Sequence, residues 1–234
     1  MFLAIREWFF RKRDRTPGRK RRIAKLFLFE FVIVVLGVLT AQLLSEAVVD
    51  SRQRQDARAA LALAKGEASV LLALAEISEE TAPCLRERSE ALLGIAMSGG
   101  TVPPEALEAP LLPSVQITPW SDRLVGAVRD NFGGSTVGRH AILVSNAESI
   151  TNANTAITQA WAEYELLAQE FGGVSEREQE ELRQAAIDLR RSLRSRQLTI
   201  DSLRRNIEGW EVEPAEEYRQ NYYDLADECG FAKD

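Results

Sequence analysis

The stretch LFLFEFVIVVLGVLTAQLL, residues 26–44, decides the architecture of this chain. An α-helix rises about 1.5 Å per residue and needs roughly 20 apolar residues to cross about 30 Å of hydrocarbon. We therefore expect a transmembrane helix over residues 26–45. A cleaved signal peptide is the alternative, because Ser45-Glu46-Ala47 has small residues at a spacing that suits signal peptidase. The length of the run favours a retained anchor, since the apolar region of a signal peptide is about 7 to 15 residues long.

The apolar run separates a basic head from an acidic body. Residues 1–25 contain ten Lys and Arg and two acidic residues, a net charge of +8. The rest of the chain contains nineteen basic and thirty-three acidic residues, a net charge of −14, and the whole chain carries −6. The positive-inside rule predicts a cytoplasmic head and an extracytoplasmic body, which in a bacterium means the inner membrane and the periplasm. Aromatic residues among the basic ones suit anionic lipid headgroups, so we expect the head to contact lipid and not nucleic acid.

Residues 46–234 are expected to form an antiparallel helical bundle that continues from the membrane helix. This body is rich in Ala, Leu, Glu and Arg, which is typical of an all-α fold. Five of the eight prolines lie between Pro103 and Pro119, so residues 101–118 are predicted to form a Pro-rich loop.

Apolar residues at three- and four-residue spacing divide the body into helices. The first is predicted to continue from the membrane span to about Thr81, where Pro83 ends it. A second helix is then expected from Cys84 to the glycines at 99–100.

Glycine and proline residues delimit the later helices. Thr118 can cap a helix that has Pro119 at its first position and that ends at the glycines at 133–134. A long stripe over residues 143–171 then predicts a helix that ends at the glycines at 172–173. Ser175 and Glu178 form a capping-box pattern at the start of the next helix, whose apolar stripe continues to residue 210. Beyond Pro214 we expect a short helix with its apolar side formed by Tyr218, Tyr222, Leu225 and Cys229.

The two long helices should fold back on each other about the glycines at 172–173. This pairing brings Thr151 and Asn154 of one helix close to Arg196 of the other. A buried polar layer of this kind fixes the register of helices at some cost in stability. The alternative is that Arg196 extends its guanidinium to solvent.

The chain has two cysteines, Cys84 and Cys229. If the body lies outside the cytoplasm, an oxidising compartment favours a disulfide between them. Two separate buried thiols are the alternative. The disulfide would place Cys229 far from the membrane, and we therefore expect the Gly172-Gly173 turn to face the membrane.

The membrane segment contains residues that suit helix association. Glu30 is a carboxylate inside an apolar span, where ionisable residues are costly and commonly functional. Gly37, Ala41 and Ser45 repeat small residues every four positions, which permits close contact with another helix. We expect lateral association with a membrane-protein partner or with a second copy, although Glu30 could instead pair locally with Lys25 at the cytoplasmic edge.

No pattern in the chain predicts catalysis. His140 is the only histidine and has no Cys or carboxylate at metal-ligand spacing, so we interpret it as a packing or surface residue. The glycines in residues 133–140 lack the Lys-Ser/Thr ending of a phosphate-binding loop, and we interpret them as a connection between helices. We predict no catalytic residues, no cofactor and no metal site.

The segment FEFVIVVLGV, residues 29–38, resembles the membrane anchor of a group of uncharacterised bacterial single-pass proteins. In that group a Glu-containing VLG anchor leads into a helical extracytoplasmic domain. Thr118-Pro119-Trp120 is similar to a Thr-x-Trp motif of the same group. The resemblance implies a topology and no particular activity.

These features together predict a non-enzymatic membrane protein. We expect an accessory, assembly or scaffold subunit that joins a larger membrane complex through its anchor and its helical periplasmic domain. The alternative is an extracytoplasmic ligand-binding sensor bundle that signals through a partner helix, because a cytoplasmic head of about 25 residues is too short to fold as a signalling domain.

Overall fold

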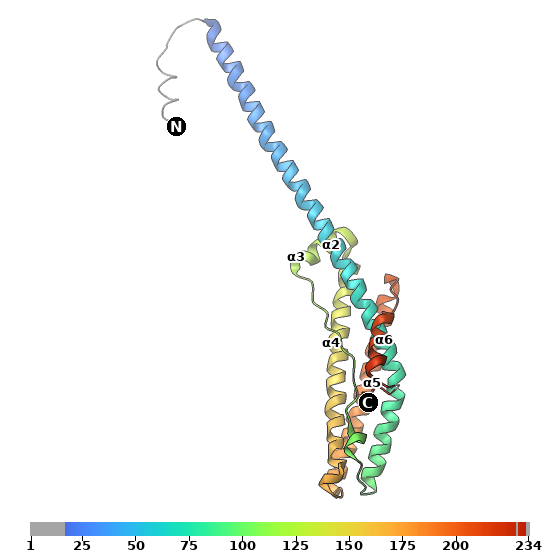
Figure 1. Cartoon of the computed structure of the whole chain (residues 1–234). Helices are drawn as coiled ribbons and strands as arrows, with labels where there is room; N and C mark the ends of the chain where they lie inside the picture. The colour runs from blue at the N-terminus through green and yellow to red at the C-terminus, as the bar shows by residue number, and fades with distance from the viewer. Residues whose placement is uncertain (1–16, 228, 233–234) are drawn as a thin grey trace. The chain divides into compact units, whose positions relative to one another are not determined.

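The computed structural model describes residues 17–227 and 229–232, with side chains from Phe27 onward. The predicted basic head, residues 1–25, therefore lies outside the described side chains. The described residues form α-helices and short 3-10 turns and contain no β-strand, which confirms the all-α prediction (Figure 1). The elements are α2 (Pro17–Met97), η1 (Pro104–Leu107), α3 (Asp122–Phe132), α4 (Gly134–Ala162), η2 (Glu163–Leu167), η3 (Gln169–Phe171), α5 (Glu176–Ile207), η4 (Glu208–Trp210) and α6 (Glu216–Leu225).

The chain divides into two compact units, Met1–Gln53 and Arg54–Asp234, which we describe separately. In the first unit, every side chain from residue 27 to residue 52 of α2 is exposed. The apolar part of α2 begins at Phe27, and α2 is the one described helix that is long and apolar enough to cross a membrane.

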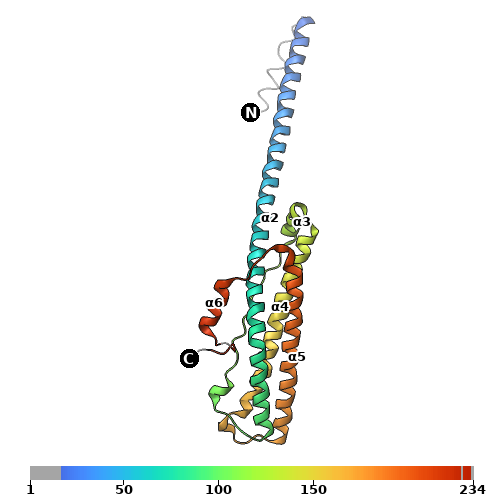
Figure 2. The same cartoon turned by 90° about the vertical axis from the view of Figure 1, so that its right-hand side faces the viewer.

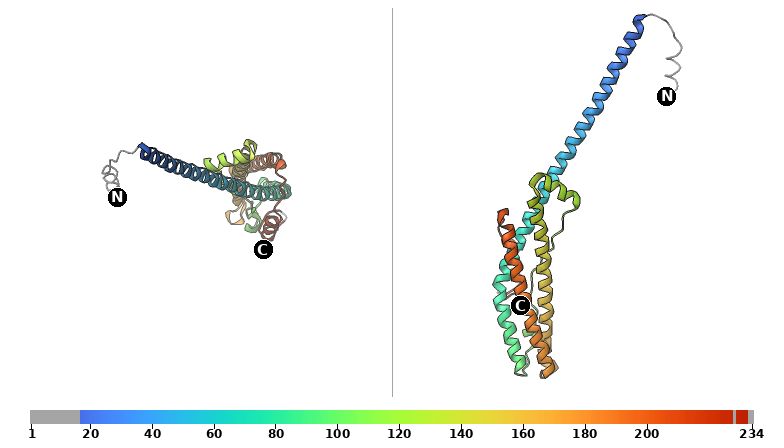
Figure 3. Two further views of the ribbon diagram at one scale, coloured as in Figure 1. Left: turned by 90° about the horizontal axis from the view of Figure 1, so that it is seen from above. Right: turned by 180° about the vertical axis from the view of Figure 1, so that it is seen from behind.

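The second unit is a bundle of α4, α5 and residues 54–97 of α2 (Figure 2). Helices α4 and α5 form the predicted antiparallel hairpin and lie side by side along their length (Figure 3). Ser175 caps α5 as expected: its hydroxyl accepts from the Glu178 amide, and the Glu178 carboxylate accepts from the Ser175 amide. All nine predicted stripe positions of the α5 region are buried: Leu182, Ala186, Leu189, Leu193, Arg196, Ile200, Leu203, Ile207 and Trp210.

The predicted break at Pro83 is wrong, because α2 continues through this residue to Met97. A proline inside a helix removes one backbone hydrogen bond and costs about 3 kcal/mol. Buried apolar residues on both sides of Pro83, such as Ile77 and Leu85, offset this cost. Pro83 itself is exposed, so its ring needs no space in the core.

The Gly172-Gly173 turn lies at the end of the second unit where α2 ends. A Cβ at Gly173 would be 3.7 Å from the Gly99 carbonyl oxygen, and Gln179 Nε2 donates to the Ala96 carbonyl oxygen at 3.1 Å. The unbroken α2 therefore carries its C-terminal end past Cys84 to this turn, and the expected position of the turn relative to the membrane stays a prediction.

Two predicted helix boundaries are also wrong. Helix α3 begins at Asp122 and not at Thr118, because the chain stays extended after Ile117, which is buried in the core. Helix α4 ends at Ala162, and the chain continues in 3-10 turns. Ala168 is held by a parallel bridge to Val102 in the loop after α2, and this pairing diverts the chain from the helix.

Two apolar residues predicted to be buried are exposed. Phe171 is 66% exposed because the chain leaves the α-helix before this residue, and the helical spacing of the α4 stripe no longer places its side chain in the core. Leu225 is 68% exposed, and Cys229 lies beyond the end of α6 at Leu225. The predicted apolar side of the last helix is therefore correct only in part.

Candidate functional site

A polar layer divides the apolar core of the bundle. One apolar cluster takes residues from 85–96 of α2, 157–161 of α4 and 182–193 of α5. A second takes residues from 64–75 of α2, 143–150 of α4 and 200–207 of α5. Four buried polar residues fall between the two clusters, and we call them the polar layer: Ser78, Thr81, Asn154 and Arg196.

The polar layer contains the predicted contact between α4 and α5. Arg196 Nη1 donates to Asn154 Oδ1 at 3.1 Å, and Asn154 Nδ2 donates to the Pro113 carbonyl oxygen at 2.7 Å. The Asn154 amide therefore connects α5 to the Pro-rich loop, and Arg196 does not reach solvent. Thr151 does not join them, because its hydroxyl donates to the Ala147 carbonyl oxygen of its own helix.

Sequence reasoning missed the two α2 members of the layer. Ser78 and Thr81 are each 1% exposed and occupy consecutive positions in the buried stripe of α2. The sequence does mark them, because they are two hydroxyl residues three positions apart in an otherwise apolar stripe. The Thr81 hydroxyl donates to the Ile77 carbonyl oxygen at 2.9 Å.

Arg196 carries an uncompensated charge. It is 2% exposed, its Nη2 atom has no hydrogen-bond partner, and no carboxylate of the described residues forms a salt bridge with it. Burial lowers the pKa of Arg196 to about 10, and the nearby Tyr222 opposes this shift. The guanidinium therefore stays protonated at neutral pH. An unpaired buried cation costs several kcal/mol of desolvation.

Tyr222 and Gly230 cover one side of the polar layer. The Tyr222 hydroxyl donates to the Leu111 carbonyl oxygen at 2.9 Å, and burial raises the pKa of Tyr222 to about 12. A Cβ at Gly230 would be 2.7 Å from Tyr222 Oη and 3.4 Å from Thr81 Cγ2. The backbone at Gly230 thus lies directly against the layer.

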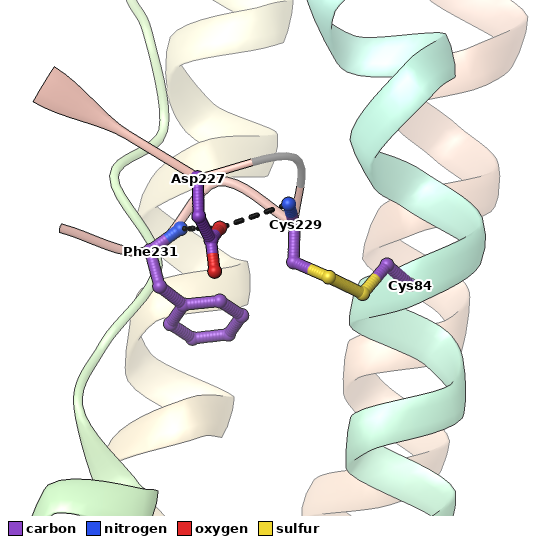
Figure 4. The surroundings of a disulfide bond; sticks show 4 residues. All are labelled: Cys84, Asp227, Cys229 and Phe231. Carbon is purple, nitrogen blue, oxygen red and sulfur yellow. Dashed lines mark hydrogen bonds between the residues drawn. A yellow bond between two sulfur atoms is a disulfide. The ribbon is translucent and has the colours of Figure 1, made fainter. Parts of the chain in front are cut away.

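We define the hook as residues 226, 227 and 229–232. Ala226 and Ala232 form an antiparallel bridge, and Asp227 Oδ1 accepts from the amides of Cys229 and Phe231 at 2.8 Å each (Figure 4). The Phe231 side chain is 3% exposed. Its ring packs on Trp161 with a centroid distance of 5.4 Å, and the Arg88 guanidinium lies 3.8 Å from its centroid.

The predicted disulfide between Cys84 and Cys229 attaches the hook to α2 (Figure 4). The two Cα atoms are 5.4 Å apart, and 145 positions of sequence separate the residues. The disulfide confirms the predicted pairing, and the described residues contain no free cysteine. The hook is therefore held both by its buried phenylalanine and by a covalent bond.

The predicted membrane-packing residues all lie in the first unit. Glu30, Gly37, Ala41 and Ser45 are exposed on α2, and a Cβ at Gly37 would meet no atom within 4 Å. No described contact tests their role in helix association, which stays a prediction.

His140 is a packing residue within α4. It is 3% exposed, and its ring stacks on Trp120 with a centroid distance of 3.8 Å and an interplanar angle of 4°. Gly133 and Gly134 connect α3 to α4, as interpreted from the sequence. Within residues 17–227 and 229–232, no group of three or more His, Cys, Asp or Glu side chains is arranged to hold a metal ion.

Comparison of the chain with protein-family models, with curated proteins and with solved structures found no match. The resemblance of the anchor to the group of single-pass proteins stays a prediction.

Proposed function

We propose that this protein is a non-enzymatic, single-pass membrane protein that serves as an accessory, assembly or scaffold subunit of a larger membrane complex. The observation that carries the proposal is the apolar part of α2, where large side chains such as Phe29, Ile33 and Leu36 are more than half exposed. Among the side chains that the structure describes in the first unit, residues 27–53, none covers them, and water is an unfavourable environment for so much apolar surface. Lipid and a partner helix would provide that cover.

The charge distribution supports a body outside the cytoplasm. The basic head precedes the apolar run and the acidic body follows it, which is the pattern of an uncleaved anchor with a cytoplasmic N-terminus. The Cys84–Cys229 disulfide agrees with this orientation, because structural disulfides persist in oxidising compartments such as the bacterial periplasm.

A reporter fused after Asp234 tests the orientation. We expect alkaline phosphatase, which needs an oxidising compartment, to be active there, and a cytosolic reporter to be inactive. Activity of the cytosolic reporter alone would reject the orientation and the proposed role together.

Purification of the intact chain in mild detergent tests the role in a complex. We expect a membrane protein to co-purify in stoichiometric amount, and Glu30→Gln or Gly37→Leu to weaken the association. Leu39→Phe is the matched control, because it enlarges a side chain on the side of the helix opposite Gly37 and Ala41. If both test variants leave the complex unchanged, the proposed contact through the anchor is wrong.

A ligand-binding sensor is the second candidate function. The observation that favours it is the positively charged Arg196 in the interior of the bundle, whose Nη2 atom has no hydrogen-bond partner. A small molecule retained through purification, without a stoichiometric protein partner, would favour the sensor over the scaffold.

A further inference from the structure

We propose that the polar layer binds one small monovalent anion, such as chloride, with Arg196 supplying the compensating charge. The inference does not depend on the proposed role in a membrane complex, because the layer lies wholly within the second unit. It rests on the charge, the hydrogen bonds and the enclosure of the layer.

The layer has more hydrogen-bond donors than acceptors. A guanidinium has five N–H donors, and Arg196 makes a single side-chain hydrogen bond, to Asn154 Oδ1. Asn154 Nδ2 is already bound to Pro113 and the Thr81 hydroxyl to Ile77. The Ser78 hydroxyl and Arg196 Nη2 are both buried without a partner. The Ser78 oxygen can accept a hydrogen bond, but none of the four residues of the layer carries a negative charge.

The missing partner of Arg196 Nη2 should be negatively charged. Water would accept a hydrogen bond from Arg196, but it would leave the buried positive charge uncompensated and would add two donors of its own. An anion satisfies the donor and the charge together, and hydrogen bonds from a guanidinium to an anion are stronger than those between neutral groups.

The enclosure of the layer restricts the size of the anion. Ser78, Thr81, Asn154 and Arg196 are each between 1% and 6% exposed. Gly230 and Tyr222 cover the layer from the side of the hook. Such an enclosed position favours a halide over a larger anion, because a metabolite with a carboxylate or phosphate group would need an open wall.

Thermal unfolding of the full chain in detergent tests this proposal, with chloride as the probe. The melting temperature should rise with chloride concentration when gluconate keeps the ionic strength constant, because a ligand that binds only the folded state stabilises it. Arg196→Met should abolish this dependence, since an apolar side chain of similar length commonly replaces a buried ion without loss of folding. Arg194→Met is the control, because Arg194 is exposed two residues earlier in α5 and should leave the dependence intact.

Bromide provides a direct measurement that needs no variant. Crystals grown with bromide in place of chloride should give an anomalous peak within hydrogen-bond distance of Arg196 Nη2. The proposal is wrong if such crystals show no peak at Arg196. It is equally wrong if wild type and Arg196→Met respond identically to chloride.

Discussion

His140 gives the bundle a sensitivity to acid at the scale of a single residue. Burial lowers the pKa of His140 below its usual value, so the unfolded chain binds a proton more readily than the folded protein. The free energy of unfolding should therefore decrease as the pH falls below about 6.5. We expect His140→Phe to remove this part of the decrease while it keeps an aromatic ring against Trp120.

Urea unfolding of both proteins between about pH 7.5 and pH 5 measures this effect, and the difference between the two curves isolates the histidine from other titrating groups. Curves that stay parallel over the whole range would contradict the assignment.

Gly230 is a second residue at which a single substitution should change the stability of the bundle. Its φ is +84°, and a Cβ would come within 2.7 Å of Tyr222 Oη. We expect Gly230→Ala to lower the free energy of unfolding by about 1 to 3 kcal/mol, because both the backbone conformation and the contact become unfavourable.

Gly66→Ala is the matched control, measured by the same chemical denaturation. Gly66 lies in α2 with no atom within 4 Å of an added Cβ, so alanine should raise the stability by about 0.5 to 1 kcal/mol. If the two substitutions change stability in the same direction, the argument from close packing at Gly230 fails.

At the scale of elements, the sequence predicted those features that depend on neighbouring residues. The Ser175 capping box and the apolar stripe of α5 are local patterns, and both were predicted correctly. The start of α3 and the end of α4 were missed because they depend on distant residues. The start of α3 follows from the burial of Ile117, and the end of α4 follows from the bridge between Ala168 and Val102.

Pro83 allows a direct test of the uninterrupted α2. Proline leaves the Glu79 carbonyl without its usual helical donor, and Pro83 is exposed. We expect Pro83→Ala to raise the free energy of unfolding by up to about 3 kcal/mol, because alanine restores this donor and has the highest helix propensity. Unfolding in guanidinium chloride measures the change. No gain, or a loss, would indicate that the chain does not form a regular helix from 79 to 83.

At the scale of the whole bundle, the hairpin and the disulfide were predictable and the hook was not. Periodicity and the glycines at 172–173 define the hairpin, and two cysteines allow one intramolecular pairing. The burial of Phe231 against Trp161 joins distant parts of the chain. No local pattern marks Phe231 as a core residue, since it follows a glycine in a segment without helical periodicity.

Reduction of the disulfide should destabilise the bundle. A cross-link that closes a loop as long as the 145 positions between Cys84 and Cys229 stabilises by at most about 5 kcal/mol in the chain-entropy model. We expect a reductant to lower the urea midpoint of the wild type substantially. The double variant Cys84→Ser/Cys229→Ser should start at the lower midpoint and should not respond to the reductant.

Mass spectrometry of an unreduced tryptic digest checks the premise of that experiment. A peptide pair joined through Cys84 and Cys229 is expected, and two alkylated cysteines in its place would reject the pairing.

The division of the core by the polar layer has a consequence for how the bundle opens. The apolar residues on either side of the layer form separate clusters, so contacts in one cluster can be lost while those in the other persist. Amide hydrogen exchange should then show two blocks of protection along each of α4 and α5, which meet near Asn154 and Arg196 and exchange with different free energies of opening.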